Sequence, residues 1–210
     1  MRIGIIGSGS VGGTLGSRWA ANGHSVVFSS RNPNSEEMKK LVGSAGPTAR
    51  TASVAEAAAA SEVILVATPW PGTRSAIESA GSLGGKIVID ATNPLKPRLD
   101  GLELGTTTSA AEQVAGWAHG ARVVKAFNTV GYNIMADPRF PAAPAVMFCC
   151  GDDPQAKQTV VRLAEELGFQ AVDAGPLTQA RLLEPFALLW ITLAYAQGQG
   201  REIAFQLMKR

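Results

Sequence analysis

The sequence has few of the residues on which disulfide frameworks, metal sites and acid–base catalysis usually depend. It contains two cysteines, which are adjacent, and two isolated histidines, His24 and His119. Two neighbouring cysteines exclude a disulfide framework and lack the spacing of zinc ligands. We interpret Cys149 and Cys150 as small apolar residues of a strand. Since no Ser/His/Asp set and no carboxylate pair stands out either, the sequence predicts no catalytic residue and no metal site.

Charge and long apolar runs are also scarce. The net charge is +2, which gives no support for a nucleic-acid partner or for a membrane surface as partner. No apolar stretch reaches the length of a transmembrane helix, and the first residues do not read as a secretory signal. We therefore expect a cytoplasmic globular protein whose partners are small molecules. Its 210 residues, 46% of them hydrophobic, suffice for one domain with a sizeable core.

Short apolar runs alternate with segments that look helical. A capping box, Ser53 with Glu56, opens one such segment, and Asp152 or Asp153 before Pro154 opens another, which ends at Gly168. The alternation predicts an α/β fold with a doubly wound, mostly parallel sheet, the Rossmann-type NAD(P)-binding architecture. The predicted strands are residues 2–7, 25–30, 62–68, 86–92, 121–127, 145–150 and 169–174.

The last part of the chain changes character. We predict a single domain over 1–210, in which 176–210 is a helical C-terminal extension: a long helix, a break at Gly198 and Gly200, and a short final helix. The apolar residues of the long helix recur near a period of 3.6 and predict one broad face. Such a face would pack on the sheet or join a second copy in a homodimer. Its members are Leu182, Leu183, Phe186, Leu189, Trp190, Leu193 and Ala194.

A glycine-rich turn follows the first predicted strand. The segment GSGSVG places Gly7, Gly9 and Gly12 in the G-x-G-x-x-G pattern, between a strand and a helix. In that context the loop and the helix N-terminus form a site for a pyrophosphate. The residues predicted to bind the cofactor here are Gly7, Ser8, Gly9, Ser10, Val11 and Gly12.

The second predicted strand ends in SSRNP, where NAD-binding proteins usually place an acidic residue that binds the ribose hydroxyls. No Asp or Glu occurs from Arg18 to Ser35. Arg31 could pair with a phosphate through its planar guanidinium, and Ser29, Ser30 and Asn32 add neutral donors. We therefore predict NADP(H) as the cofactor, with Ser30, Arg31 and Asn32 at its 2′-phosphate.

Three further loops follow predicted strands, at residues 67–72, 90–95 and 125–133. Because ligands of open α/β sheets bind beyond the carboxyl ends of the strands, these loops are expected to form a slot for the nicotinamide and a second ring. Trp70, Phe127 and Tyr132 offer flat apolar surface, while Asn93 and Asn128 offer uncharged polar groups. Lys125 and Tyr132 are candidate proton donors, and each also fits a purely structural role.

Several stretches together resemble a known family, the NADP oxidoreductases dependent on the deazaflavin coenzyme F420. They are similar as well to the reductase domain of the STEAP ferrireductases. The stretches are VATPWP, DATNPL, VVKAFNTVG, DAGPLTQARLLEP and the segment from GIIGSG to SSRNP, so the resemblance spans nearly the whole chain. The resemblance implies direct hydride transfer between NADPH and a deazaflavin, coenzyme F420, or a flavin such as FMN or FAD. It also implies cofactor-binding roles for Ala67, Thr68, Pro69, Trp70, Asn93, Ala126, Phe127 and Asn128.

Two other functions remain compatible with these residues. An NADPH-binding sensor would share the fold and the cofactor site without any turnover. A reductase of small ketones or imines would share the cofactor, but relatives of that type carry a long helical C-terminal domain with a catalytic Lys or Asp. Only about 35 residues follow the last predicted strand here, which disfavours that alternative.

Overall fold

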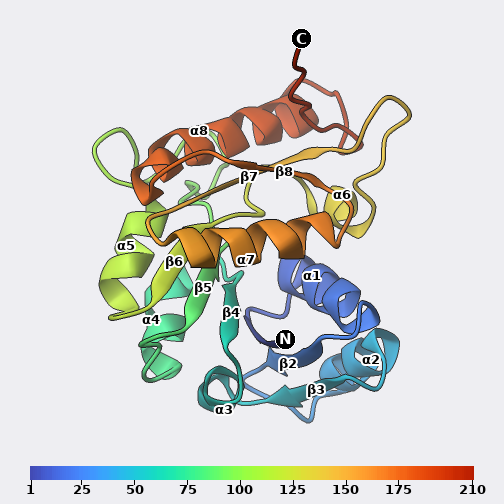
Figure 1. Cartoon of the computed structure of the whole chain (residues 1–210), viewed down its shortest axis with the longest axis vertical. Helices are drawn as coiled ribbons and strands as arrows, with labels where there is room; N and C mark the ends of the chain where they lie inside the picture. The colour runs from blue at the N-terminus through green and yellow to red at the C-terminus, as the bar shows by residue number, and fades with distance from the viewer.

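A computed structural model describes the whole chain, residues 1–210, around one eight-stranded sheet (Figure 1). The strand order is β3-β2-β1-β4-β5-β6-β7-β8. The strands are β1 (Arg2–Ile6), β2 (Ser25–Ser29), β3 (Ala49–Ala52), β4 (Val63–Val66), β5 (Ile87–Asp90), β6 (Arg122–Lys125), β7 (Val146–Gly151) and β8 (Gln170–Asp173). The helices are α1 (Ser10–Ala21), α2 (Glu36–Ala45), α3 (Val54–Ala59), α4 (Trp70–Ser79), α5 (Ala110–Trp117), α6 (Tyr132–Ala136), α7 (Pro154–Glu165) and α8 (Ala180–Ile191), with a 3-10 turn η1 (Leu177–Gln179) and a π-helical turn η2 (Thr192–Ala196).

The predicted doubly wound, mostly parallel sheet is confirmed. All neighbouring strands run parallel except β6 and β7, which pair antiparallel. Each of the seven predicted apolar runs coincides with a strand, to within one residue at the end of β7. No apolar run marks the eighth strand, β3, whose sequence ARTA is short and half polar. It forms at the edge of the sheet, where β2 supplies the parallel partner backbone.

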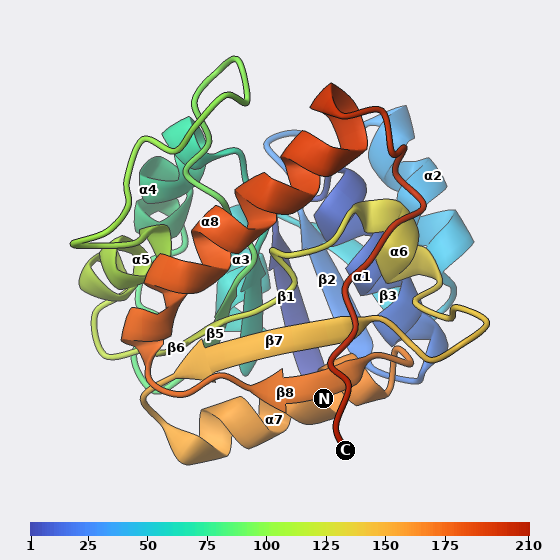
Figure 2. The ribbon, with the colours of Figure 1, turned by 90° about the horizontal axis from the view of Figure 1, so that it is seen from above.

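Helices cover both faces of the sheet (Figure 2). The alternation of side chains along each strand separates two apolar cores. On β7, for example, Cys149 belongs to the larger core, under α1 and α7, and Cys150 belongs to the core beneath α4, α5 and α8. Both cysteines are fully buried, which confirms that they act as apolar strand residues.

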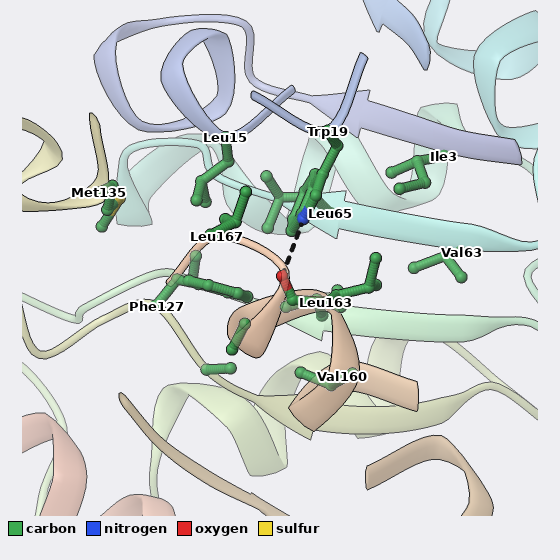
Figure 3. Close-up of a cluster of buried hydrophobic side chains, with 14 of the residues drawn as sticks. Ile3, Leu15, Trp19, Val63, Leu65, Phe127, Met135, Val160, Leu163 and Leu167 are labelled. Carbon is green, nitrogen blue, oxygen red and sulfur yellow. Dashed lines mark hydrogen bonds between the residues drawn. The ribbon is translucent and has the colours of Figure 1, made fainter. Parts of the chain in front are cut away.

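Trp19 of α1 occupies the centre of the larger core (Figure 3). Its indole N–H donates a hydrogen bond to the carbonyl oxygen of Leu163 at 3.2 Å, so the buried polar atom is satisfied. The ring also packs edge-on against Phe127, with centroids 5.6 Å apart. Truncating such a residue to alanine typically costs about 3–5 kcal/mol of unfolding free energy.

The predicted helix starts are confirmed. The Ser53 side chain accepts the Glu56 N–H, and the Glu56 carboxylate accepts the Ser53 N–H, which completes the capping box of α3. Asp153 caps α7 by accepting the N–H of Ala156 at 2.7 Å, directly before Pro154. These local signals fix where the connections between strands and helices turn.

The prediction of a short final helix is wrong. After η2 the chain turns at Gly198 and Gly200, both with positive φ, and continues without helix to residue 210. The Phe205 carbonyl oxygen accepts the Val146 N–H at 3.0 Å, and the Ile203 carbonyl accepts the Trp190 indole N–H at 2.8 Å. Because these bonds use backbone groups along an extended segment, the segment cannot close helical turns.

The single broad apolar face predicted for the long helix is also wrong. Leu183 of α8 is buried in the core beneath the helix, and Trp190 is buried beside Gly131 and Ile203, whereas Leu182 and Leu189 are 66% and 47% exposed. Leu182 and Leu189 are seven residues apart, about two turns, and therefore share a second stripe on the outer side. The apolar residues of α8 thus divide into an inner and an outer stripe.

Candidate functional site

The glycine-rich loop joins β1 to α1 at the carboxyl end of the sheet. Gly7 has φ +97°, and a Cβ atom there would lie 2.6 Å from the carbonyl oxygen of Ala67. Gly9 is different, since a Cβ atom there would meet nothing within 4 Å. It is also the N-cap of α1 and provides no side-chain cap. The first N–H groups of α1 therefore remain available to an anion, and the backbone at Gly9 is open to close approach.

The next glycines serve packing. A Cβ atom on Gly12 would overlap the carbonyl oxygen of Gly7, and one on Gly16 would overlap the ring of Phe28. These two residues let α1 lie directly on β1 and β2. The Ser8 hydroxyl donates to the carbonyl oxygen of Ser29 at 2.9 Å and ties the loop to the end of β2.

A cleft of about 530 Å³ begins at this loop. It lies where β1 sits between β2 and β4, which is the point where the strand order reverses and where dinucleotides bind in open α/β sheets. Seven of the predicted cofactor residues line this cleft: Gly7, Ser8, Gly9, Ser30, Arg31, Thr68 and Pro69. An eighth, Ser10, lines an adjoining cleft. The fold thus brings three separate predicted segments to one cavity.

Arg31 is exposed at the mouth of the cleft and makes no ion pair with the protein, so its guanidinium is available to a ligand. Asn32 is also exposed, and its N–H donates to the Ser30 hydroxyl oxygen at 3.0 Å. Glu37, in the first turn of α2, lines the cleft beside Arg31. No sequence motif predicts Glu37 as a residue of the cleft. It follows the SSRNP segment in the sequence and reaches the cleft because of where α2 packs.

The segment after β4 forms the opposite wall. Thr68 and Thr73 share a hydrogen bond of 2.9 Å between their hydroxyl groups, which fixes the start of α4 against the loop. Trp70 is half-buried and stacks on Trp117 of α5. Ala67 lies under Gly7. The cleft also receives side chains that no motif predicted, and these are Met38, Val54, Ser75, Ala76 and Ser79.

The loops after β5 and β6 are joined by a reciprocal pair of asparagines. The Asn93 amide donates to the Asn128 carbonyl oxygen at 2.9 Å, and the Asn128 amide donates to the Asn93 side-chain oxygen at 3.1 Å. The structure therefore brings these two predicted residues together. Neither residue lines the cleft that contains Arg31.

The expectation that Phe127 offers flat surface to a ligand is wrong. The residue has φ +62°, and this left-handed conformation turns its ring into the core, where it packs against Trp19 and Phe169. Its side chain is 1% exposed, and Ala126 is fully buried. A non-glycine residue in this region of φ carries strain of about 1–3 kcal/mol.

Lys125 is bound in a buried ion cluster and not poised as a proton donor. Its ammonium lies 2.9 Å from Asp90 and 2.8 Å from Glu184, and all three side chains are buried. Burial alone would lower the pKa of Lys125, but the two carboxylates outweigh it and hold the pKa above its usual range. Glu184 was not predicted at the site, because it reaches Lys125 from α8, 59 residues later in the chain.

Tyr132, the other candidate proton donor, begins α6 and is 39% exposed. The guanidinium of Arg201 lies over its ring, 4.4 Å from the centroid. This cation–π contact holds the C-terminal segment against α6.

None of the helices combines the length and apolar character that crossing a bilayer requires. Residues 2–94 match the family described as NADP oxidoreductase, coenzyme F420-dependent. The chain is 30% identical over 206 residues to the F420-dependent NADP reductase of Methanocaldococcus jannaschii, covering 92% of each protein. A crystal structure of a provisionally assigned F420-dependent NADP reductase from Arthrobacter sp. FB24 superposes with a TM-score of 0.90, at 31% identity and over the full length of both chains.

The metalloreductase STEAP3 of Rattus norvegicus is 35% identical over 188 residues. Those residues are 89% of this chain but 36% of STEAP3, so the chain spans about a third of that relative. The archaeal reductase, in contrast, is covered over 92% of its length. By sequence and by fold, the chain belongs to the coenzyme F420-dependent NADP oxidoreductase family, a family of NADPH-dependent oxidoreductases.

Proposed function

We propose that the protein transfers a hydride between NADP(H) and a deazaflavin of the coenzyme F420 type. The observation that carries the proposal is the cleft at the strand-order reversal, where the open backbone of Gly9 and the unpaired guanidinium of Arg31 line one cavity. A glycine loop with a free helix N-terminus fits a pyrophosphate, and a free arginine at the end of β2 fits a 2′-phosphate.

Bound NADPH would supply the hydride, and the protein would supply orientation. In the proposed arrangement Ser30, Arg31 and Asn32 hold the 2′-phosphate, while Thr68, Pro69 and Trp70 flank the nicotinamide side. Asn93 and Asn128 border the place where the two rings meet. Direct hydride transfer between stacked rings depends on alignment and needs no general acid. This requirement agrees with a cleft whose titratable side chains are Arg31 and Glu37.

The deciding experiment mixes the protein anaerobically with NADPH and, separately, with coenzyme F420, FMN or FAD, and follows nicotinamide absorbance. Rapid oxidation with F420 and with NADPH, but not with NADH, is the expected result. Oxidation with FMN or FAD would reassign the acceptor to a flavin. Tight NADPH binding without any turnover would contradict the enzyme function for these acceptors and favour a sensor.

Arg31→Ala tests the cofactor assignment. Losing a charged hydrogen-bond partner of the 2′-phosphate should weaken NADPH binding about tenfold or more and leave NADH binding unchanged. Arg162→Ala is the matched control, because Arg162 is an exposed arginine on α7, outside the cleft and without an ion pair. Equal NADPH affinity in both variants would remove Arg31 from the site.

The outer stripe of α8 supports a further proposal, a homodimer. Leu182 and Leu189 expose 66% and 47% of their surface on one side of the helix, and an exposed apolar stripe of this kind favours association. Light scattering should therefore give twice the monomer mass for the wild type. Leu182→Glu should shift the mass toward 21.8 kDa.

A further inference from the structure

The ion cluster around Lys125 joins three sequence motifs that the cofactor cleft leaves without a role. Its ammonium contacts Asp90 at 2.9 Å, Glu184 at 2.8 Å and the carbonyl oxygen of Thr92 at 2.6 Å. Asp90 ends β5 in DATNPL, Lys125 ends β6 in KAFNT, and Glu184 lies on α8 in LLEP. None of the three side chains is more than 1% exposed.

The cluster carries one positive and two negative charges, so its excess charge must be balanced elsewhere. The N-terminus of α5 provides this balance. The Glu184 carboxylate accepts the N–H of Ala110 at 2.9 Å and of Ala111 at 3.2 Å. These groups lack partners within the helix, and the helix end is partially positive. Glu184 therefore ties α8 to α5 and, through Lys125, to β5 and β6.

The neighbouring residue extends the connection to the asparagine pair. The carbonyl oxygen of Leu183 accepts the Asn128 amide at 3.1 Å, while the same amide donates to Asn93. On the β5 side, one oxygen of Asp90 accepts the N–H and the hydroxyl of Thr92, directly before Asn93. Both loops of the proposed ring slot are thus held at consecutive residues of α8.

The loop after β6 contains polar atoms that form no hydrogen bond within the protein. The side-chain oxygens of Asn128 and Thr129 are buried and have no partner in the protein. Such atoms are costly to bury, so their positions must be imposed by the surrounding contacts. For Asn128, the contacts that impose this position are its amide bonds to Asn93 and to the Leu183 carbonyl oxygen.

We infer that Glu184 is a positioning residue, which holds the loops after β5 and β6 in the geometry that hydride transfer requires. The inference rests on the proposed function, since it assigns those loops to the ring slot. Glu184 acts through Lys125 and the Leu183–Asn128 contact and is not itself placed against the rings. It should therefore affect ring alignment and leave the adenosine end of the cofactor, at Arg31, unaffected.

Glu184→Gln is the informative substitution. Both carboxylate oxygens act as acceptors, one toward Ala110 and the other toward Ala111 and Lys125. A carboxamide must point its NH₂ at one of these donors, whichever way it is turned. The size of the side chain and the neutral Asp90–Lys125 pair are kept, so the fold should persist while the loops shift.

The matched control is Glu112→Gln. Glu112 also joins α5 to α8, through a hydrogen bond of 2.9 Å with Arg181, but this pair is partly exposed and makes no contact with Lys125. The two variants each remove one carboxylate that links the same two helices. They differ in one respect: Glu184 also contacts Lys125 at the end of β6, whereas Glu112 does not.

The experiment measures NADPH affinity, the emission spectrum of bound NADPH, and single-turnover hydride transfer to coenzyme F420. For Glu184→Gln we expect NADPH affinity within about twofold of wild type and a transfer rate at least about tenfold lower, because small misplacements of reacting groups strongly slow transfer. The emission of the bound nicotinamide should shift, since it reports the surroundings of the ring. Glu112→Gln should match the wild type in all three.

If Glu184→Gln matches Glu112→Gln in rate and emission, and differs only in melting temperature, Glu184 is merely structural and the inference is overturned. Should Glu184→Gln fail to fold, Glu184→Asp keeps the charge with a shorter reach and should show the same split between affinity and rate. An Asp variant with wild-type rate and emission would also overturn it. A wild type that binds NADPH without reducing F420 refutes the proposed acceptor, and the emission shift still decides the role of Glu184.

Discussion

The indole rings of Trp70 and Trp117 are stacked, with centroids 5.4 Å apart and planes inclined by 27°. Trp70 is the first residue of α4, and Trp117 is the last residue of α5. The stack therefore sets the orientation of Trp70, which we place beside the nicotinamide. It does so from a helix that contributes nothing to the cofactor cleft.

Trp117→Leu should release the Trp70 ring and lower kcat/KM for NADPH oxidation several-fold. The lost aromatic contact should also lower the free energy of unfolding by about 1 kcal/mol. Urea denaturation and anaerobic turnover would measure the two effects. The control is Arg74→Gln, since Arg74 lies 6.0 Å from the Trp117 ring and its loss leaves the stack intact. Wild-type kinetics in Trp117→Leu would show that the orientation of Trp70 is unimportant.

Glu37 should moderate the preference for NADP(H) over NAD(H). Glu37 and Arg31 line the same cleft, where the carboxylate would repel the proposed 2′-phosphate and could accept hydrogen bonds from a ribose hydroxyl. Glu37→Gln should therefore bind NADPH about three- to tenfold more tightly at low salt, and the gain should shrink at high salt because exposed charges are screened. Titration calorimetry with both nucleotides measures the change.

Glu36→Gln is the control for that experiment. Glu36 lies one residue earlier in α2, pairs with Lys39 at 2.7 Å and does not line the cleft. An equal change in both variants would indicate a general charge effect and would contradict a specific role of Glu37.

Two glycines of the same loop should respond to alanine in opposite ways. Gly9→Ala should fold with nearly unchanged stability, because its Cβ meets nothing within 4 Å, yet it should lose NADPH affinity at least about tenfold. Gly12→Ala should be destabilised by several kcal/mol, because its Cβ overlaps the Gly7 carbonyl oxygen. Chemical denaturation and NADPH titration separate the two effects. Full NADPH affinity in Gly9→Ala would exclude close approach of the cofactor at that residue.

The buried cysteines should make the protein less stable in alkali. Burial raises the pKa of Cys150 to about 12 and raises the pKa of Cys149 as well. Above the ordinary thiol pKa of about 8.5, the unfolded chain loses protons that the folded chain retains, so stability falls as pH rises. The expected slope is up to about 1.4 kcal/mol per pH unit for each cysteine.

Urea denaturation at several pH values between 8 and 10 would measure this slope. Cys150→Ala should reduce it by about half. Native protein at pH 8 should also resist alkylation, because neither thiol ionises or is accessible. Rapid alkylation of the native protein would contradict the burial of the pair.

The features that could be predicted from the sequence are local ones. The turn from β1 to α1, the capping box at Ser53 and the start of α7 at Pro154 each depend on residues within a few positions of one another. The prediction for Arg31 is also local. It depends on an arginine at the end of β2, where NAD-binding proteins usually have an acidic residue. Sequence patterns describe such features well because the interacting groups share one segment.

The features that escaped prediction depend on contacts between distant segments. β7, α7 and β8 separate Glu184 from Lys125 along the chain, and Glu37 reaches the cleft because of where α2 packs. The ring of Phe127 points into the core because of a single left-handed residue, which apolar patterning does not specify. Lys125 itself shows the difference, since its strand position was predictable and its two carboxylate partners were not.

The glycines of the loop after β1 and of α1 have different roles, and this difference affects how related chains diverge in evolution. Gly12 and Gly16 are held in place by the fold, since any side chain there would push α1 off the sheet. Gly9 is under no such constraint, and selection for the bound nucleotide alone would preserve it. A descendant that gives up its cofactor should therefore lose Gly9 first while keeping Gly12 and Gly16. The residue at this one position would then separate active lineages from those that retain only the scaffold.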